Sequence, residues 1–169
     1  LGDAPCSGPT RVHMTNPQNV HPDGPNPPQL NSLDASTTVV SLTIGGNDIG
    51  FSEVAQGCIT VNPFSHPCLD KYNAGGVNQL KARIDATAPK VAAVLQGIKS
   101  RAPSAKIYVV NYPAIFPETG FGCWPQMPIG FQDVPYLRTT QKQLNSMLAT
   151  QAAANGATLV NWYGASIGH

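Results

Sequence analysis

TTVVSLTIGGNDIGF, residues 37–51, is the stretch that decides the fold. Its first eight residues are β-branched and mostly apolar, which is typical of a strand buried on both faces of a parallel sheet, and the glycines that follow end the strand. Ligands of parallel α/β sheets bind beyond the carboxyl ends of the strands, where Asn47 stands. The stretch therefore predicts a buried strand that ends in a binding edge.

Two helices and two further strands are expected to follow in alternation. The predicted helices are 77–101 and 136–154, and the predicted strands are 106–112 and 158–162. Apolar residues recur at helical spacing in both helices, and Pro89 predicts a kink or a break in the first. This order calls for right-handed crossovers and a parallel sheet covered by helices, and proline-rich loops are expected over 9–31 and 113–135. We expect one α/β domain.

The composition restricts the possible partners. The 169 residues carry a formal net charge of +1, and only 11% of them are charged. Nucleic-acid binding needs a concentrated field of Lys and Arg, so a small molecule or lipid is the expected partner instead. A surface this poor in charge is typical of secreted proteins. The sequence has no run of about 18 apolar residues, so no membrane span is predicted.

The four cysteines are Cys6, Cys58, Cys68 and Cys123. None of them forms a C-x-x-C pair, and the histidines show no metal-ligand spacing, so no metal site is expected. Cys58 and Cys68 flank the loop ITVNPFSHP, which we expect a disulfide to close; the alternative is two buried free thiols. Cys6 and Cys123 are far apart in sequence, and two pairings stay open for them: with each other, or with cysteines outside the chain.

The block GGNDIG has several chemical interpretations. A dinucleotide fingerprint G-x-G-x-x-G needs a glycine at its third position, where Asn47 stands, and a phosphate loop needs a lysine where Phe51 stands. A carboxamide N–H is suited to stabilise the negative oxygen of acyl transfer, and the two glycines allow close approach to it. Asp48 is expected to cap the next helix. The alternative is an Asx turn that ends a strand.

Together with Cys6-Ser7-Gly8, this block resembles the third and second conserved blocks of the SGNH hydrolases, also called GDSL esterases and lipases, in their secreted actinobacterial branch. The resemblance extends to Cys58…Cys68, to APSAKIYVVNYP and to the final SIGH, and so covers essentially the whole chain. It implies a three-layer α/β/α sandwich with a parallel flavodoxin-like sheet. It also assigns the backbone of Gly8 and the side chain of Asn47 to the oxyanion hole.

The sequence departs from the family pattern at both ends. The nucleophilic serine of the family follows a Gly-Asp pair, but Ala4 follows Gly2-Asp3 here, and no Asp-x-x-His occurs. We therefore expect residues 1–169 to be an internal segment of a longer single domain, inactive alone, with the nucleophile and the general base outside it. In the family, the counterparts of Cys6 and Cys123 pair with cysteines that would lie beyond the two ends.

The resemblance implies a secreted, monomeric carboxylic ester hydrolase of esterase, lipase or phospholipase type, which forms an acyl-enzyme without metal or cofactor. Its substrates would be small-molecule or lipid esters, with transient contact to a membrane or lipid surface. Gly46, Ile49, Phe51 and Tyr112 follow two predicted strand ends and are expected to line an acyl pocket, with core packing as the alternative. The rival function is a non-catalytic α/β binding module that has lost its nucleophile and base.

Overall fold

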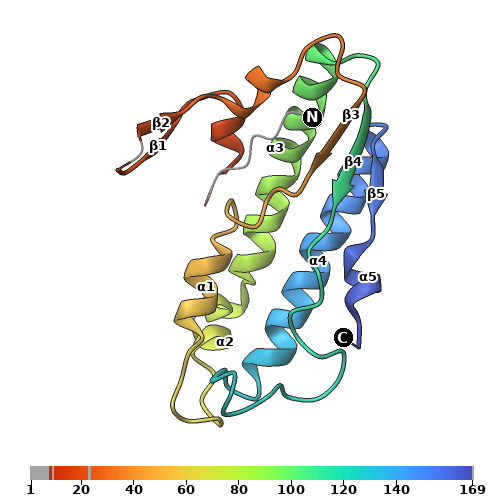
Figure 1. Cartoon of the computed structure of the whole chain (residues 1–169). Helices are drawn as coiled ribbons and strands as arrows, with labels where there is room; N and C mark the ends of the chain where they lie inside the picture. Colours follow the sequence, from red (N-terminus) through yellow and green to blue (C-terminus); the bar gives the residue numbers. More distant parts are fainter. Residues whose placement is uncertain (1–7, 9, 23, 169) are drawn as a thin grey trace.

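The computed structural model describes residues 8, 10–22 and 24–168. The main sheet consists of β3 (Val39–Leu42), β4 (Lys106–Val110) and β5 (Thr158–Val160), which run parallel in the order β3-β4-β5. The long helices α3 (Gln79–Arg101) and α4 (Asp133–Ala154) connect these strands and pack against each other (Figure 1). The predicted α/β class with a parallel sheet is confirmed.

One face of this sheet forms the main core. The side chains that alternate toward α3 and α4 are Val40, Leu42, Ile107, Val109 and Leu159. On the opposite face, Val39 is 58% exposed and Val160 is 41% exposed. Within residues 8, 10–22 and 24–168 the long helices cover one face only, so the second helical layer of the expected sandwich is not among them.

The long elements differ from their predicted bounds in ways that local contacts explain. Helix α3 runs through Pro89 without a break, because Pro89 lies on the exposed side of the helix. The prediction that the helix breaks at Pro89 is therefore wrong. The last strand ends at Val160 instead of 162, since the Asn161 side chain accepts the Gly164 N–H at 3.0 Å and starts the short helix α5 (Trp162–Ser166).

Several short elements lie where loops were predicted or no element was named. They are η1 (Arg11–Met14), β1 (Gln18–Val20), β2 (Gly24–Asn26), η2 (Gln29–Ser32), α1 (Phe51–Gly57), α2 (Pro67–Tyr72) and η3 (Ala74–Gly76). Strands β1 and β2 pair antiparallel. Elements of three to seven residues are too short to show a hydrophobic period, and contacts with the rest of the fold decide them.

A second core cluster fixes the segments that follow the site. Cys58 and Cys68 form the predicted disulfide, and both are fully buried. The Asp133 carboxylate accepts the backbone N–H groups of Cys68 at 3.0 Å and Leu69 at 2.8 Å, which satisfies two donors in the first turn of α2. Burial raises the pKa of Asp133 above its usual value. These contacts join α2 to the start of α4.

Candidate active site

The backbone turns sharply after β3 and presents Asn47. Residues 44–46 are buried, whereas Asn47 is exposed. The Phe51 N–H donates to the Gly46 carbonyl at 3.0 Å, which closes the turn around Asn47. Gly45 has a φ of 102° and Gly50 a φ of 74°, values that side-chain-bearing residues rarely adopt. The glycines therefore permit a turn that leaves one amide side chain at the carboxyl end of the sheet.

Tyr112, two residues after β4, lies directly against this turn. Its hydroxyl oxygen accepts the Gly46 N–H at 2.8 Å. A Cβ on residue 46 would lie 2.7 Å from that oxygen and 2.9 Å from Cζ of the same ring, so only glycine fits here. Burial is the main cause that raises the pKa of Tyr112, and the charge of Asp48 adds to it. The phenol is therefore neutral at ordinary pH.

Two buried amides on α4 hold the segment that carries Tyr112. Asn145 accepts the Tyr112 N–H at 3.0 Å and donates to the Tyr112 carbonyl at 2.9 Å. One turn earlier on the helix, Gln141 donates to the Pro113 carbonyl and accepts the Ile115 N–H at 3.2 Å. Both amides are almost fully buried, so these hydrogen bonds satisfy polar groups that would otherwise be costly to bury.

The residues that follow Asn47 are held from other directions. Asp48 was expected to cap the next helix, but α1 has no side-chain cap, and Asp48 instead accepts the Arg11 N–H at 3.1 Å. The Arg11 Nε also lies 3.9 Å from the same carboxylate. Arg83 of α3 donates to the Ile49 carbonyl at 3.1 Å. Every neighbour of Asn47 from 46 to 49 is thus bonded to a distant part of the chain.

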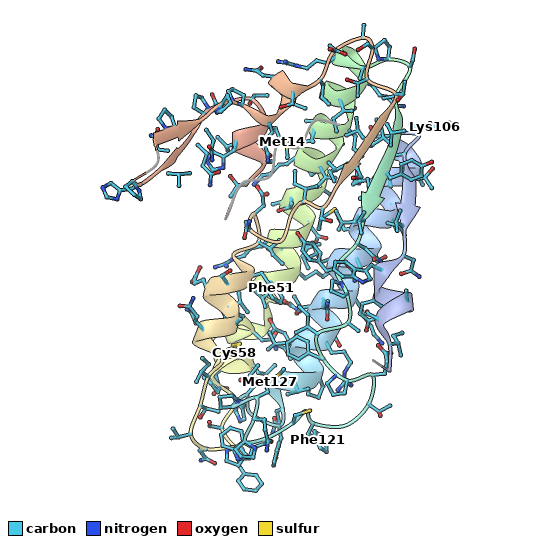
Figure 2. All side chains as sticks on the ribbon, in the orientation of Figure 1. Met14, Phe51, Cys58, Lys106, Phe121 and Met127 are labelled. Carbon is cyan, nitrogen blue, oxygen red and sulfur yellow. A yellow bond between two sulfur atoms is a disulfide. The ribbon has the colours of Figure 1, made fainter. Side chains whose placement is uncertain are left out.

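A cavity of about 120 Å³ opens beside Asn47. It is lined by Gly46, Asn47, Phe51, Ser52, Tyr112, Ile115, Gln141 and Leu144. Three of the four residues predicted for an acyl pocket therefore lie at this cavity, and Figure 2 labels Phe51 at the start of α1. Ile49 does not: it is 1% exposed and belongs to the main core, because the turn points it toward α3 and α4.

Gly8, the other predicted oxyanion donor, is exposed. Its neighbours Ser7 and Pro9, and also Cys6, lie outside the described residues. Arg11, which bonds Asp48, follows Gly8 by three positions and ties this part of the chain to the turn. Cys123 is exposed and forms no disulfide in the part of the chain that the structure describes. The same part holds no cluster of three His, Cys, Asp or Glu side chains arranged for a metal ion.

The sequence analysis missed Ser52, Gln141, Leu144 and Asn145. A signal for the two amides was present: Gln141 and Asn145 are four residues apart and share a helix face with Leu137, Leu144 and Leu148. Amides inside an apolar stripe are candidates for bonding backbone groups that no strand or helix satisfies. No local pattern, however, indicated which backbone groups these were.

Comparison with known proteins identifies the family of the chain. A profile of the GDSL-like lipase/acylhydrolase family matches residues 6–169. The chain is 36% identical over 148 residues to Lipase 2 of Streptomyces coelicolor, covering 84% of this chain and 49% of that lipase. It is 32% identical to Lipase 1 of the same organism over 133 residues, covering 77% of this chain and 45% of that lipase. The chain thus spans about half the length of these relatives.

A solved structure extends the similarity to the fold. The crystal structure of phospholipase A1 from Streptomyces albidoflavus NA297 superposes with a TM-score of 0.70 at 28% sequence identity. The superposition covers 91% of this chain and 57% of that one. The arrangement of sheet and helices described above is therefore that of this group of hydrolases.

Proposed function

Because the chain belongs to the GDSL-like lipase/acylhydrolase family, we propose that the protein hydrolyses carboxylic esters, with a serine nucleophile and a general base that lie outside these 169 residues. In this mechanism the serine attacks the ester carbonyl and forms an acyl-enzyme, which water then hydrolyses. The Asn47 carboxamide and the Gly8 backbone N–H stabilise the negative oxygen that develops at each tetrahedral step. The cavity beside Asn47 receives the acyl chain.

The observation that carries this proposal is the placement of Asn47. It is the exposed residue in a turn whose flanking backbone is buried, and it stands at a cavity whose other lining residues include Phe51, Ile115 and Leu144. An uncharged donor beside an apolar cavity suits the oxygen of an ester carbonyl and the acyl chain attached to it. An Asx turn alone would not require the cavity.

The test uses the full-length protein and a series of p-nitrophenyl esters of increasing acyl length. We expect measurable hydrolysis, and we expect Asn47→Ala to lower kcat by about a hundredfold to a thousandfold, the usual scale for one oxyanion donor. Asn19→Ala, an exposed asparagine on β1, is the matched control and should leave kcat unchanged. An inactive wild type would favour the binding-module alternative, and full activity in Asn47→Ala would remove Asn47 from the mechanism.

We also propose that the end of the molecule beyond the cavity contacts a lipid surface. We call this region the apolar tip; it comprises the loop 59–66 and residues 121–131. Val61 is 97% exposed, Phe64 75% and Phe121 61%. Phe131 lies between the two phenylalanines, with ring centroids 5.6 Å from Phe64 and 6.0 Å from Phe121. Figure 2 shows Phe121 and Met127 at this end, beyond Cys58.

The charges and the rigidity of the apolar tip favour a neutral acyl surface as its partner. Residues 54–69 and 119–132 contain no Asp, Glu, Lys or Arg, so the apolar tip has no Lys or Arg with which to bind an anionic headgroup. The disulfide closes the first loop, and the Thr60 N–H and Phe131 N–H bond carbonyls of the other loop. Helix α1 links the cavity to this loop over about 10 Å, the length of seven helical residues, so a surface bound here would lie close to the cavity.

Sedimentation with phosphatidylcholine vesicles tests this contact. Replacing Val61 and Phe64 by Asn should weaken binding of the full-length protein at least tenfold. Full burial of both side chains would contribute roughly 3–6 kcal/mol, and about 1.4 kcal/mol of this already corresponds to a factor of ten. Val39→Asn, which changes a 58% exposed valine on the sheet, should have no effect. Equal binding by all three proteins would refute the assignment, and tighter binding to anionic vesicles would contradict its neutral character.

We also propose that the protein is exported from the cell and is a monomer. The Cys58–Cys68 disulfide is typical of an oxidising compartment, and the cavity is built from one chain. No helix among the described residues has the length and apolar character needed to cross a membrane. Size-exclusion chromatography of protein recovered from the culture medium checks both statements.

A further inference from the structure

The hydrogen bonds around Tyr112 form a continuous path from α4 to the turn that carries Asn47. The first link is Asn145, which bonds both backbone polar groups of Tyr112, at 3.0 Å and 2.9 Å. This pairing fixes the position of the Tyr112 backbone as a neighbouring strand would, although β4 has already ended at Val110. Because Asn145 is only 7% exposed, water does not compete for these bonds.

The second link is the phenol. With its backbone fixed, the Tyr112 ring reaches the turn, and its oxygen accepts the Gly46 N–H at 2.8 Å. The contact is tight, since a Cβ on residue 46 would come within 3.2 Å of three atoms of the Tyr112 side chain. The Gly46 N–H is thereby committed to the phenol and is not an oxyanion donor itself. Its bond instead fixes the Gly45–Gly46 peptide plane, one residue before Asn47, while the Gly46 carbonyl of the next peptide accepts the Phe51 N–H at 3.0 Å.

We propose that Tyr112 is a positioning residue, which holds the Asn47 carboxamide in the geometry needed for the oxyanion through its hydrogen bond to Gly46. This inference rests on the proposed esterase function. An oxyanion donor must be placed before charge develops, because reorganisation during the reaction removes much of its benefit. Asn47 follows two glycines and is exposed, so hydrogen bonds to the backbone on either side contribute to the rigidity of its position.

The test is Tyr112→Phe in the full-length enzyme, which removes one oxygen and keeps the ring. We expect kcat to fall about tenfold with KM unchanged, since a small misplacement of a catalytic group has effects of this order. Tyr108→Phe is the matched control, because Tyr108 lies on β4 with its side chain on the face away from the helices. It should leave kcat unchanged.

A double-mutant cycle separates positioning from a general structural role. If Tyr112 acts through Asn47, Tyr112→Phe should not lower the residual activity of Asn47→Ala any further. A tenfold loss in both backgrounds would overturn the proposal. So would wild-type kcat in Tyr112→Phe alone while Asn47→Ala is impaired, and that result would leave the esterase function intact. A wild type that hydrolyses no ester, in contrast, would refute the function itself.

Amide hydrogen exchange provides a measurement that does not depend on activity. In the wild type the Gly46 N–H should be protected, and in Tyr112→Phe it should exchange at least tenfold faster, while amides in the middle of α4 remain unchanged. Equal exchange of Gly46 in both proteins would show that the hydroxyl does not hold the turn, and would overturn the proposal.

Discussion

The contact between Gly46 and Tyr112 yields a stability prediction that can be worked out from distances. In Gly46→Ala the new Cβ would lie 2.7 Å from the phenol oxygen, 2.9 Å from Cζ and 3.2 Å from Cε1. These distances must increase by several tenths of an ångström before they are ordinary contacts. The ring cannot simply withdraw, because Asn145 holds the Tyr112 backbone at both of its polar groups.

The expected cost is that of an overpacked core site, about 1–3 kcal/mol in the free energy of unfolding. Gly46 does not have a positive φ, so alanine is compatible with its backbone and brings no strain of its own. In a Tyr112→Leu background the three clashing atoms are gone, and Gly46→Ala should become slightly stabilising, by about 0.5 kcal/mol, because it restricts the unfolded chain. The two substitutions should therefore be coupled by about 2 kcal/mol.

Urea unfolding of the four proteins, followed by circular dichroism, measures this coupling. Gly45→Ala is the control: its φ of 102° makes alanine strained, but the nearest atoms lie 3.7 Å away. It should destabilise the protein by about 1–3 kcal/mol in both backgrounds, since backbone strain does not depend on Tyr112. A coupling between Gly46→Ala and Tyr112→Leu within about 0.5 kcal/mol of zero would refute the reasoning.

Three further predictions concern other parts of the chain. Replacing Cys58 and Cys68 by Ala should lower the free energy of unfolding by about 3 kcal/mol, because the bridge closes a loop of sequence separation 10, and urea unfolding with and without reductant measures it. Pro89→Ala should raise the midpoint of thermal unfolding. Alanine favours the helix interior more than proline does, and this effect exceeds the loss that arises because alanine restricts the unfolded chain less, so the free energy of unfolding should rise by about 1–2 kcal/mol; a lower midpoint would contradict this. Burial and a hydrogen bond to Glu118 raise the pKa of Tyr163 to about 12, so this phenol stabilises the fold below pH 10, and that stability is lost as the pH rises through 10 to 12. Stability curves of wild type and Tyr163→Phe should converge over that range, and parallel curves would exclude the coupling.

The two long helices could be predicted because their patterns are long, and the three strands because each is a run of apolar and β-branched residues. Strand β3 ends at Leu42, two residues before the predicted end, and α4 begins at Asp133, three residues before its predicted start. The helix period survives an interruption by Pro89, since the buried residues Ile84 and Val91 lie on either side of it. The short helix α1 carries only Val54 as a buried residue, and one apolar position defines no period.

The turn that carries Asn47 could be predicted from the sequence, and the bonds that hold this turn could not. Asn47 and its glycines are adjacent in sequence, so the turn could be recognised from one short block. The bonds that hold the turn join residues separated by 66, 37 and 34 positions: Gly46 to Tyr112, Arg11 to Asp48, and Ile49 to Arg83. The prediction that Asp48 caps a helix failed for this reason, because a local acceptor role could not be distinguished from a distant one.

In the proposed mechanism Asn47 must stay accessible to the substrate, and this requirement explains why its support comes from distant residues. A donor to a substrate oxygen must have small neighbours, and Gly45 and Gly46 meet this condition. Residues without side chains cannot fix a loop by packing, so the rigidity of the turn has to come from hydrogen bonds to its backbone. Besides the local Phe51–Gly46 bond, these bonds come from segments that the fold brings to the carboxyl end of the sheet: the segment after β4, α3 and the segment that carries Arg11. Accessibility and rigidity at Asn47 are therefore supplied by different parts of the sequence, and a substitution at Tyr112 can impair the second without changing the first.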